Sequence, residues 1–330
     1  NSGTSAQHIA CLAAGITQGS LVWTSPNSFA ASANCARYCG ADVDFVDINP
    51  RTRNMCVSTL AEKLQSAKKL NALPDALVVV HFAGSSCDMQ EIAALTKPLG
   101  ITLIEDAAHA LGGKDALGNL VGKCTFSDMA VLSFHPVKSI TSAEGGAVTT
   151  NSKTLAQKLK LFASHGITKN SDELPAGHND EPWFYAQNEL GYNYRLSDLH
   201  AVLGRSQLER LDDYISQRRN KALQYEERLS ALPVILPLSD LNSAWHLYVI
   251  ELESHDRTSV FNALRNKNIG VNVHYIPIHF HPYYRKQGFA EGQFPHTEHY
   301  YQRAISLPLY PGLSADDQNY VINTLSEVLA

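Results

Sequence analysis

The chain has 330 residues, of which 44% are apolar and 18% are charged. Its net charge of −5 and isoelectric point near 6.3 argue against a nucleic-acid surface, because such surfaces concentrate lysine and arginine. No apolar stretch approaches the ~18–20 residues that a membrane span requires, so we expect neither a nucleic-acid nor a membrane partner.

The length and the cysteines add two further expectations. A chain of this size exceeds the limit at which a single hydrophobic core stops growing, so two subdomains are expected. The six cysteines include no Cys-x-x-Cys pair, which argues against a zinc site. Reduced thiols and the absence of a visible signal peptide favour a cytoplasmic protein.

The chain opens with small and hydroxylated residues that lead into an alanine-rich helical pattern, Asn1-Ser-Gly-Thr-Ser-Ala-Gln-His-Ile-Ala10. Unpaired backbone amides and the helix dipole make such a helix start a site for an anion. Thr4 and Ser5 place hydroxyl groups beside these amides. The pattern predicts a phosphate site, although an ordinary serine or threonine N-cap would look similar.

Strand-like and helix-like patterns alternate over the first two thirds of the chain. The short apolar runs 76–82, 101–104 and 129–134 read as buried strands. The stretches 60–70 and 89–99 read as helices. This alternation predicts an α/β sheet with helices on both faces.

Asp106 follows one of these strands directly. A carboxylate at a strand end can pair with a protonated ring nitrogen, as pyridoxal phosphate requires, and the charged ring then acts as an electron sink. His109, three residues further on, would pack against the ring or bond its 3′-oxygen. The alternative for Asp106 is the N-cap of the next helix.

Lys138 follows the next strand, in Ser133-Phe-His-Pro-Val-Lys138. The proline ends the strand, because it has no amide hydrogen for the ladder. Lys138 therefore sits at the exit of a strand, where open α/β sheets bind their ligands. There its amine can hold an aldehyde cofactor as a Schiff base, and the hydroxyl of Ser133 can reach the cofactor's phosphate. A solvated surface lysine is the alternative, but Asp106 and the helix start together favour one cofactor site.

The remainder of the chain has a different pattern. Residues 164–182 are rich in Gly, Asn, Asp and Pro and predict a long surface excursion. Residues 197–232 are charged and helical, and we expect them to link a large domain to a smaller α+β domain. In that domain we expect strands at 245–252 and 271–276, a helix at 257–267, and a final helix capped by Ser314 with Asp317.

The chain resembles the DegT/StrS family of sugar-nucleotide aminotransferases, which use pyridoxal phosphate. The resemblance covers essentially the whole chain. A later block is similar to a narrower branch, the UDP-linked amino-sugar transaminases of pseudaminic acid synthesis. The family motifs are Gly3-Thr-Ser-Ala6, Pro26-Asn-Ser-Phe29, Glu105-Asp-Ala-Ala-His-Ala-Leu-Gly112, Ser133-Phe-His-Pro-Val-Lys138, Glu144-Gly-Gly146 and Gly191-Tyr-Asn-Tyr-Arg195, and those of the branch are Val273-His-Tyr-Ile-Pro277, Pro282-Tyr-Tyr284 and Ala304-Ile-Ser-Leu-Pro-Leu309.

The resemblance implies the aspartate-aminotransferase-like fold, known as fold type I. We expect a large cofactor-binding α/β domain over residues 1–208, with a mostly parallel seven-stranded sheet. Residues 209–330 would form the linking helix and the small α+β domain. Family members carry some tens of residues ahead of the Gly-Thr motif, which begins here at Gly3, so we expect that a leading segment is missing from this sequence.

The resemblance also implies roles for individual residues. Lys138 would bind the cofactor and move protons, and Asp106 would pair with the ring nitrogen. The remaining cofactor contacts would come from Thr4, Ser5, Phe29, His109, Ser133 and Asn193, the last from the neighbouring subunit of a homodimer. The substrate would be bound by Gly3, Asn193, His274, Tyr275, Ile276 and Pro277.

The implied reaction moves an amino group from an amino acid, usually glutamate, to a 4-keto nucleotide sugar. Two half-reactions through one site predict ping-pong kinetics. A related dehydratase that uses the same coenzyme is an alternative, but that branch carries histidine in place of the lysine. A non-catalytic family member is another alternative, and it would be expected to lose the site residues.

Two smaller alternatives concern single features. Phe29, expected to stack on the cofactor, could instead be an ordinary core aromatic. His274, His279 and His281 could be interpreted as a metal cluster. No acid or cysteine pairs with these histidines, and their proline-broken spacing fits no helix-borne site, so no metal is expected.

Overall fold

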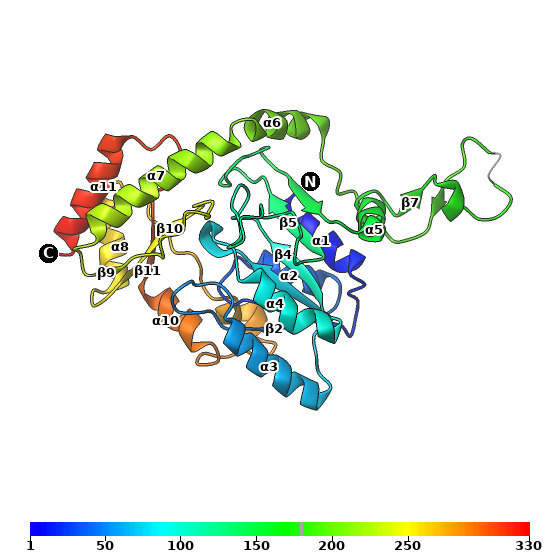
Figure 1. Cartoon of the computed structure of the whole chain (residues 1–330), viewed down its shortest axis with the longest axis horizontal. Coiled ribbons are helices and arrows are strands. Elements are labelled where there is room, and N and C mark those ends of the chain that lie inside the picture. Colours follow the sequence, from blue (N-terminus) through cyan, green and yellow to red (C-terminus); the bar gives the residue numbers. More distant parts are fainter. Residues whose placement is uncertain (179–180) are drawn as a thin grey trace.

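The computed structural model describes residues 1–178 and 181–330. Its centre is a six-stranded sheet in the order β2-β1-β3-β4-β5-β6 (Figure 1). Neighbouring strands run parallel except β5 and β6, which pair antiparallel. The strands are β1 (Leu21–Thr24), β2 (Asp42–Phe45), β3 (Ala76–Val80), β4 (Thr102–Asp106), β5 (Met129–Ser133) and β6 (Gly146–Thr149).

The predicted α/β class with a mainly parallel sheet is confirmed, but the predicted seven strands are not found. The sheet of the described residues has six. The backbone of Ser2 and Gly3 stands so close to Gly146 in β6 that a β-carbon on this glycine would collide with it. Because Gly3 already belongs to a helix, it is the start of a helix that lies against Gly146 of β6.

Strand β3, inside the sheet, is apolar along its whole length, as expected for a parallel strand covered on both faces. Strand β3 reads Ala-Leu-Val-Val-Val, and all five residues are buried. It ends at Val80, two residues before the predicted end, since His81 leads into a short 3₁₀ turn. The runs predicted at 101–104 and 129–134 are β4 and β5.

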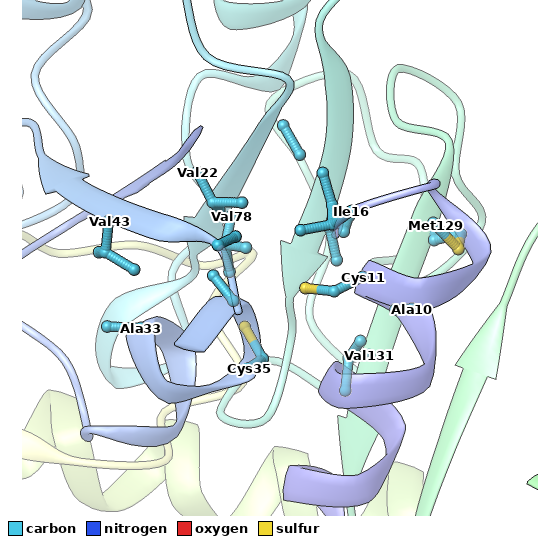
Figure 2. Close-up of a cluster of buried hydrophobic side chains, with 14 of the residues drawn as sticks. Ala10, Cys11, Ile16, Val22, Ala33, Cys35, Val43, Val78, Met129 and Val131 are labelled. Atoms are coloured by element: carbon cyan, nitrogen blue, oxygen red, sulfur yellow. The ribbon is translucent and has the colours of Figure 1, made fainter. Parts of the chain in front are cut away.

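Helices cover both faces of the sheet, as the alternating pattern predicted. On one face, Cys11 and Cys35 pack with Val22 and Val78 in a single core (Figure 2). The other face is covered by two helices that pack on Trp23 and its neighbours. The first face carries α1 (Gly3–Ala13), α2 (Ala31–Tyr38) and α5 (Lys153–Ala163), and the second carries α3 (Val57–Leu70) and α4 (Met89–Thr96).

The C-terminal part has its own antiparallel sheet in the order β11-β10-β9. Three helices, α7, α8 and α11, pack on it around the buried rings of Tyr225 and Tyr248. The strands are β9 (Val234–Ile235), β10 (Tyr248–Leu252) and β11 (Ala304–Leu307). The helices are α6 (Asp198–Leu208), α7 (Leu211–Leu229), α8 (Arg257–Asn266), α9 (Pro282–Arg285), α10 (Pro295–Arg303) and α11 (Ala315–Val328).

Two strand predictions in this part need correction. Residues 271–276 form no strand, because only Asn272 pairs with β11, through Ser306. The chain then leaves the sheet, and the His274 ring bonds the Ser306 hydroxyl at 2.7 Å. The strand expected at 245–252 begins only at Tyr248. The predicted helix at 257–267 is α8, and Ser314 caps α11 by accepting a hydrogen bond from the backbone N–H of Asp317 at 3.0 Å.

The stretch predicted as one linking helix is two helices, α6 and α7, which meet at residues 209–210 and run along the top of the molecule in Figure 1. The domain boundary proposed after residue 208 falls at this break and stays a prediction. Helix α7 has 19 residues and many charges. Among the described residues, no helix combines the length and apolar character that crossing a membrane requires.

The described residues of the predicted surface excursion at 164–182 project from the molecule (Figure 1). Strand β7 (Ile167–Thr168) lies within it and pairs antiparallel with β8 (Ala186–Gln187), which follows it in the chain. Residues 179–180 of this predicted segment lie outside the described residues. The 3₁₀ turns of the chain are η1 (Phe82–Gly84), η2 (Lys97–Leu99), η3 (Ser171–Glu173) and η4 (Ile278–Phe280).

A buried ion triad joins the two parts of the chain. Arg53, from the loop after β2, donates its Nε to Glu251 of β10 at 2.7 Å. The other carboxylate oxygen of Glu251 accepts from Arg303 of α10 at 2.6 Å. Arg53 and Glu251 are both almost fully buried. The contact therefore fixes the C-terminal sheet against the loop after β2.

Candidate active site

A cavity of about 300 Å³ lies at the carboxyl ends of β3, β4 and β5 and beside the loop that follows β1. The strand order reverses between β1 and β3, and open α/β sheets bind ligands at such a switch point. The start of α1 and residues 274–275 complete the walls. Of the predicted site residues, those lining the cavity are Gly3, Thr4, Phe29, Asp106, His109, Ser133, Lys138, His274 and Tyr275.

Lys138 reaches the cavity from a turn after β5, closed by its backbone N–H donating to the His135 carbonyl at 2.9 Å. Its side chain is half-buried, which excludes a freely solvated surface lysine. Burial lowers the pKa of the Lys138 amine to about 8, although the negative charge of Asp106 acts in the opposite direction. A lysine amine of this kind is nucleophilic near neutral pH.

Asp106 ends β4 and is buried at the floor of the cavity. Its Oδ2 accepts a hydrogen bond from the Ser32 hydroxyl at 2.6 Å and another from the Gln7 side-chain amide. Its Oδ1 accepts from the backbone N–H of Ala108 at 3.2 Å. No helix begins after Asp106, since the next residues form turns, so the N-cap alternative is wrong.

His109 is buried between two other rings. The hydroxyl of Tyr275 lies 3.0 Å from its Nε2, and the His246 ring lies tilted beside it at a centroid distance of 4.3 Å. Burial holds the pKa of His109 well below its ordinary value, and the Lys138 amine adds to this effect. His109 is therefore a neutral imidazole. Its Nδ1 is buried and has no hydrogen-bond partner among the described residues.

The start of α1 is pressed against the end of β5. A β-carbon on Gly3 would stand 2.9 Å from the Ser133 Cβ, so only glycine fits without a shift. Thr4 lines the cavity, but Ser5 does not. The Ser5 hydroxyl and backbone N–H both bond Ser2, which caps the helix. The N-cap interpretation therefore describes Ser2 and Ser5, and a phosphate contact of Ser5 stays a prediction.

Phe29 lies at the mouth of the cavity, 61% exposed. Its ring stands 6.3 Å from that of Tyr275. The core-aromatic alternative is therefore wrong. The exposed face of the ring is free to cover a flat ligand.

Besides Ser5, three predicted residues do not line the cavity. Asn193 is exposed, and its carbonyl accepts a hydrogen bond from Asn1 at 3.2 Å. Ile276 is 46% exposed, whereas Pro277 is buried. The expected contacts of these residues stay predictions, and that of Asn193 concerns a neighbouring subunit.

The histidines considered as a metal cluster are separated by their contacts. The His274 ring faces the cavity and Ser306, and burial lowers its pKa to about 4. The His279 ring bonds Glu298 at 2.9 Å in a different, buried place. In the described part of the chain, no group of three or more His, Cys, Asp or Glu side chains could hold a metal ion.

Several lining residues were missed from the sequence, among them Gln7, Ser32 and Glu144. Gln7 lies one helical turn after Gly3, so it shares the face of α1 that turns toward the cavity. Ser32 lies three residues after Phe29, at the start of α2. Helical spacing from a predicted site residue is the sequence signal that points to them.

The lining fits pyridoxal phosphate. The carboxylate of Asp106 has about four acceptor positions, and three are occupied, which leaves one for a ring nitrogen. Among the described residues, the Lys138 amine has neither a hydrogen bond nor an ion pair, and the orphaned Nδ1 of His109 can serve a ring oxygen. Thr4 and Ser133, which both carry a hydroxyl group, line the same cavity.

The fold and this cavity together define a class, the pyridoxal-phosphate-dependent enzymes with the aspartate-aminotransferase-like fold. The sequence model of the DegT/DnrJ/EryC1/StrS aminotransferase family matches residues 1–326. The chain belongs to this family, and it is a sugar aminotransferase. Its cofactor is pyridoxal 5′-phosphate, as in this family. Among the similar solved structures, that of NtdA from Bacillus subtilis, 27% identical, holds bound PMP.

Three relatives illustrate the similarity. The UDP-4-amino-4,6-dideoxy-N-acetyl-beta-L-altrosamine transaminase of Campylobacter jejuni is 37% identical, over 100% of this chain and 84% of its own length. The spore coat polysaccharide biosynthesis protein SpsC of Bacillus subtilis is 36% identical, with the same coverage. The structure of Helicobacter pylori PseC, an aminotransferase involved in the biosynthesis of pseudoaminic acid, has a TM-score of 0.87 and 30% identity, over 100% of this chain and 85% of that chain.

Proposed function

We propose that this enzyme transfers an amino group from an amino acid, L-glutamate, to C4 of a UDP-linked 4-keto-6-deoxy sugar in pseudaminic acid biosynthesis. The observation that carries the proposal is the meeting of Lys138 and Asp106 in one cavity. The 37% identity to the Campylobacter jejuni transaminase supports the choice of substrate.

The cofactor, when bound, supplies an aldehyde that captures amines and a charged ring that stabilises a carbanion. In our proposal Lys138 holds the aldehyde and Asp106 holds the ring nitrogen in its charged form. His109 bonds the ring oxygen, and Phe29 covers the face of the ring. Thr4, Ser5 and Ser133 hold the phosphate, together with Asn193 of a neighbouring subunit.

Lys138 is also the proton carrier. As a free base, its Nζ would take the proton from Cα of the amino-acid donor and pass it to C4′ of the cofactor. In the second half-reaction it returns a proton to C4 of the sugar. The lowered pKa of about 8 suits both directions, because an amine near its pKa gains and loses protons easily.

The substrate side of the site is formed by residues 274–277 and Gly3. His274 and Tyr275 line the cavity, and Ile276 and Pro277 follow them in the chain. His274 is neutral at physiological pH, because burial holds its pKa near 4. It therefore offers a hydrogen bond to a sugar hydroxyl rather than a charge to a phosphate.

We further propose a homodimer with shared active sites. Helix α6 supports this proposal, because its apolar side chains Leu199 and Val202 are 85% and 69% exposed. Exposed apolar side chains that lie close together often mark a contact with another protein chain. Asn193, expected to reach a neighbouring site, lies a few residues before this helix. We also propose a cytoplasmic location, which the six free cysteines support.

Other functions within the family remain as alternatives. A 4-keto sugar aminotransferase of the perosamine or 4-amino-arabinose type would use the same cavity with a different sugar. The dehydratase alternative is disfavoured by Lys138, and a non-catalytic role is disfavoured by a complete set of Lys138, Asp106 and Ser133 around one cavity.

A panel of UDP- and dTDP-linked 4-keto sugars with glutamate as donor tests the proposal. We expect the fastest amination with the UDP-linked 6-deoxy sugar. The purified enzyme should absorb near 400–430 nm, and borohydride should bleach this band. Lys138→Ala should remove both the band and turnover. A visible band without amination of any sugar in the panel would refute the proposed reaction while leaving the cofactor site intact.

A further inference from the structure

The carboxylate of Asp106 is held from behind by two helices. Gln7 on α1 and Ser32 on α2 both donate to the same oxygen, Oδ2. Gln7 is 4% exposed and Ser32 is 1% exposed, so water does not compete with either contact. The two donors are far apart in sequence, and only the packing of α1 beside α2 brings them together.

The direction of these hydrogen bonds follows from the chemistry of the groups. An ionised carboxylate only accepts, so Gln7 must present its Nε2 and not its Oε1. Ser32 has one hydroxyl proton, and the carboxylate receives it. The hydroxyl of Ser28, 2.7 Å from that of Ser32, must therefore donate to Ser32. The result is a chain of hydrogen bonds from Ser28 through Ser32 to Asp106.

These contacts fix the orientation of the carboxylate. With Oδ2 held by two side chains, the group cannot rotate without breaking both bonds. Oδ1 has only the backbone N–H of Ala108, so its second acceptor position is the one that remains. A bound ring nitrogen would find this acceptor already oriented, and preorganised groups need no rearrangement during the reaction.

We propose that Gln7 and Ser32 are positioning residues that orient Asp106 toward the cofactor's ring nitrogen, with Ser28 orienting Ser32 in turn. This inference rests on the proposed role of Asp106. The segment 28–32 acquires a double role, because Phe29 lies at the cavity mouth between the two serines. This segment thus positions both the Phe29 ring at the cavity mouth and the carboxylate of Asp106.

The test uses Ser32→Ala, Gln7→Met and the double variant. Each single change should weaken cofactor binding and lower kcat of the glutamate half-reaction by about tenfold, as expected for one lost hydrogen bond to a charged group. The KM for glutamate should change little. The pH midpoint of the visible band should rise, because a ring nitrogen held less firmly in its charged form repels the Schiff-base proton less. Ser32→Thr keeps the hydroxyl and should restore wild-type behaviour.

Ser314→Ala is the matched control, since it removes a serine hydroxyl that caps α11 far from the cavity. It should lower the melting temperature without moving the band or the cofactor affinity. If Ser32→Ala does not fold, Gln7→Met and Ser28→Ala decide the question. A wild-type protein without a visible band would refute the proposed function itself. A normal wild-type band with unchanged midpoint, affinity and kcat in the variants would refute only the positioning role.

Discussion

Gly3 and Ser133 are in contact at the base of the cavity, where the first turn of α1 meets the end of β5. A β-carbon on residue 3 would stand 2.9 Å from the Ser133 Cβ and 3.0 Å from its Oγ. Both residues line the cavity where we propose that the cofactor binds. The close approach of two backbone segments thus shapes the cofactor site as much as the chemistry of its side chains.

Gly3→Ala should weaken cofactor binding. The new methyl group would push α1 away from β5, and we expect the dissociation constant for pyridoxal phosphate to rise about tenfold or more, as small displacements at a preorganised site do. Equilibrium titration of the visible band measures this. Gly270→Ala is the control, because a β-carbon there meets nothing within 4 Å. Equal affinities for the two variants would contradict the packing argument.

Lys138 should make the stability of the cofactor-free protein depend on pH. Its pKa falls from 10.5 to about 8 on folding, so burying the charged amine destabilises the protein fully below pH 8. Between about pH 8 and 10.5 the unfolded state binds more protons, and stability rises with pH. The advantage of Lys138→Met over wild type should therefore shrink across this range. Melting temperatures at pH 7 and pH 10 measure it, with Lys69→Met at an exposed position as the control. If the melting temperatures of Lys138→Met and wild type differ by the same amount at pH 7 and pH 10, the charged amine is not destabilised by burial.

Glu251→Gln should destabilise the protein strongly. It leaves the buried guanidinium of Arg53 without its charge partner, and breaking such a pair typically costs about 3–5 kcal/mol. Asp42→Asn is the control, since it removes an exposed pair with Arg37 that contributes about 0–1 kcal/mol. Urea unfolding of both variants gives the comparison. If both variants lose a similar free energy of unfolding, the buried triad contributes no more to stability than the exposed pair.

Leu199→Arg should prevent self-association. An arginine at the most exposed apolar position of α6 would place a charge in the proposed dimer contact. Light scattering should show a monomer with reduced transaminase activity. Leu70→Arg is the matched control, because Leu70 is 77% exposed at the end of α3, away from α6. A dimeric Leu199→Arg variant would place the interface elsewhere.

The parts of the site that were predictable lie at strand ends. Asp106 and Lys138 follow apolar runs, and the carboxyl ends of parallel strands lie at one edge of the sheet, so their meeting follows from the strand pattern alone. Gln7 and Ser32 reach Asp106 through the packing of α1 on α2, which no local pattern records. A hydroxyl residue at a helix start, such as Ser5, can bind an anion or cap its own helix, so the sequence alone cannot choose between the two roles.

The C-terminal part shows the same limit. Residues 271–276 have the composition of a strand, but tertiary contacts draw the chain out of the sheet after Asn272. Those contacts bring His274 and Tyr275 to the cavity. A local preference for strand was overridden where the chain has to deliver side chains to a site built by the other part of the molecule.

The Arg53–Glu251–Arg303 triad restricts how molecules can reach the interior. A hinge motion of the C-terminal sheet away from the loop after β2 would separate the buried guanidinium of Arg53 from Glu251. Opening of the cavity by such a motion is therefore unfavourable. The substrate would then enter at the mouth of the cavity, where Phe29 and Val137 are exposed to solvent. We expect sugar nucleotides to enter the cavity there after the rotation of a few side chains, without a large movement of the C-terminal sheet.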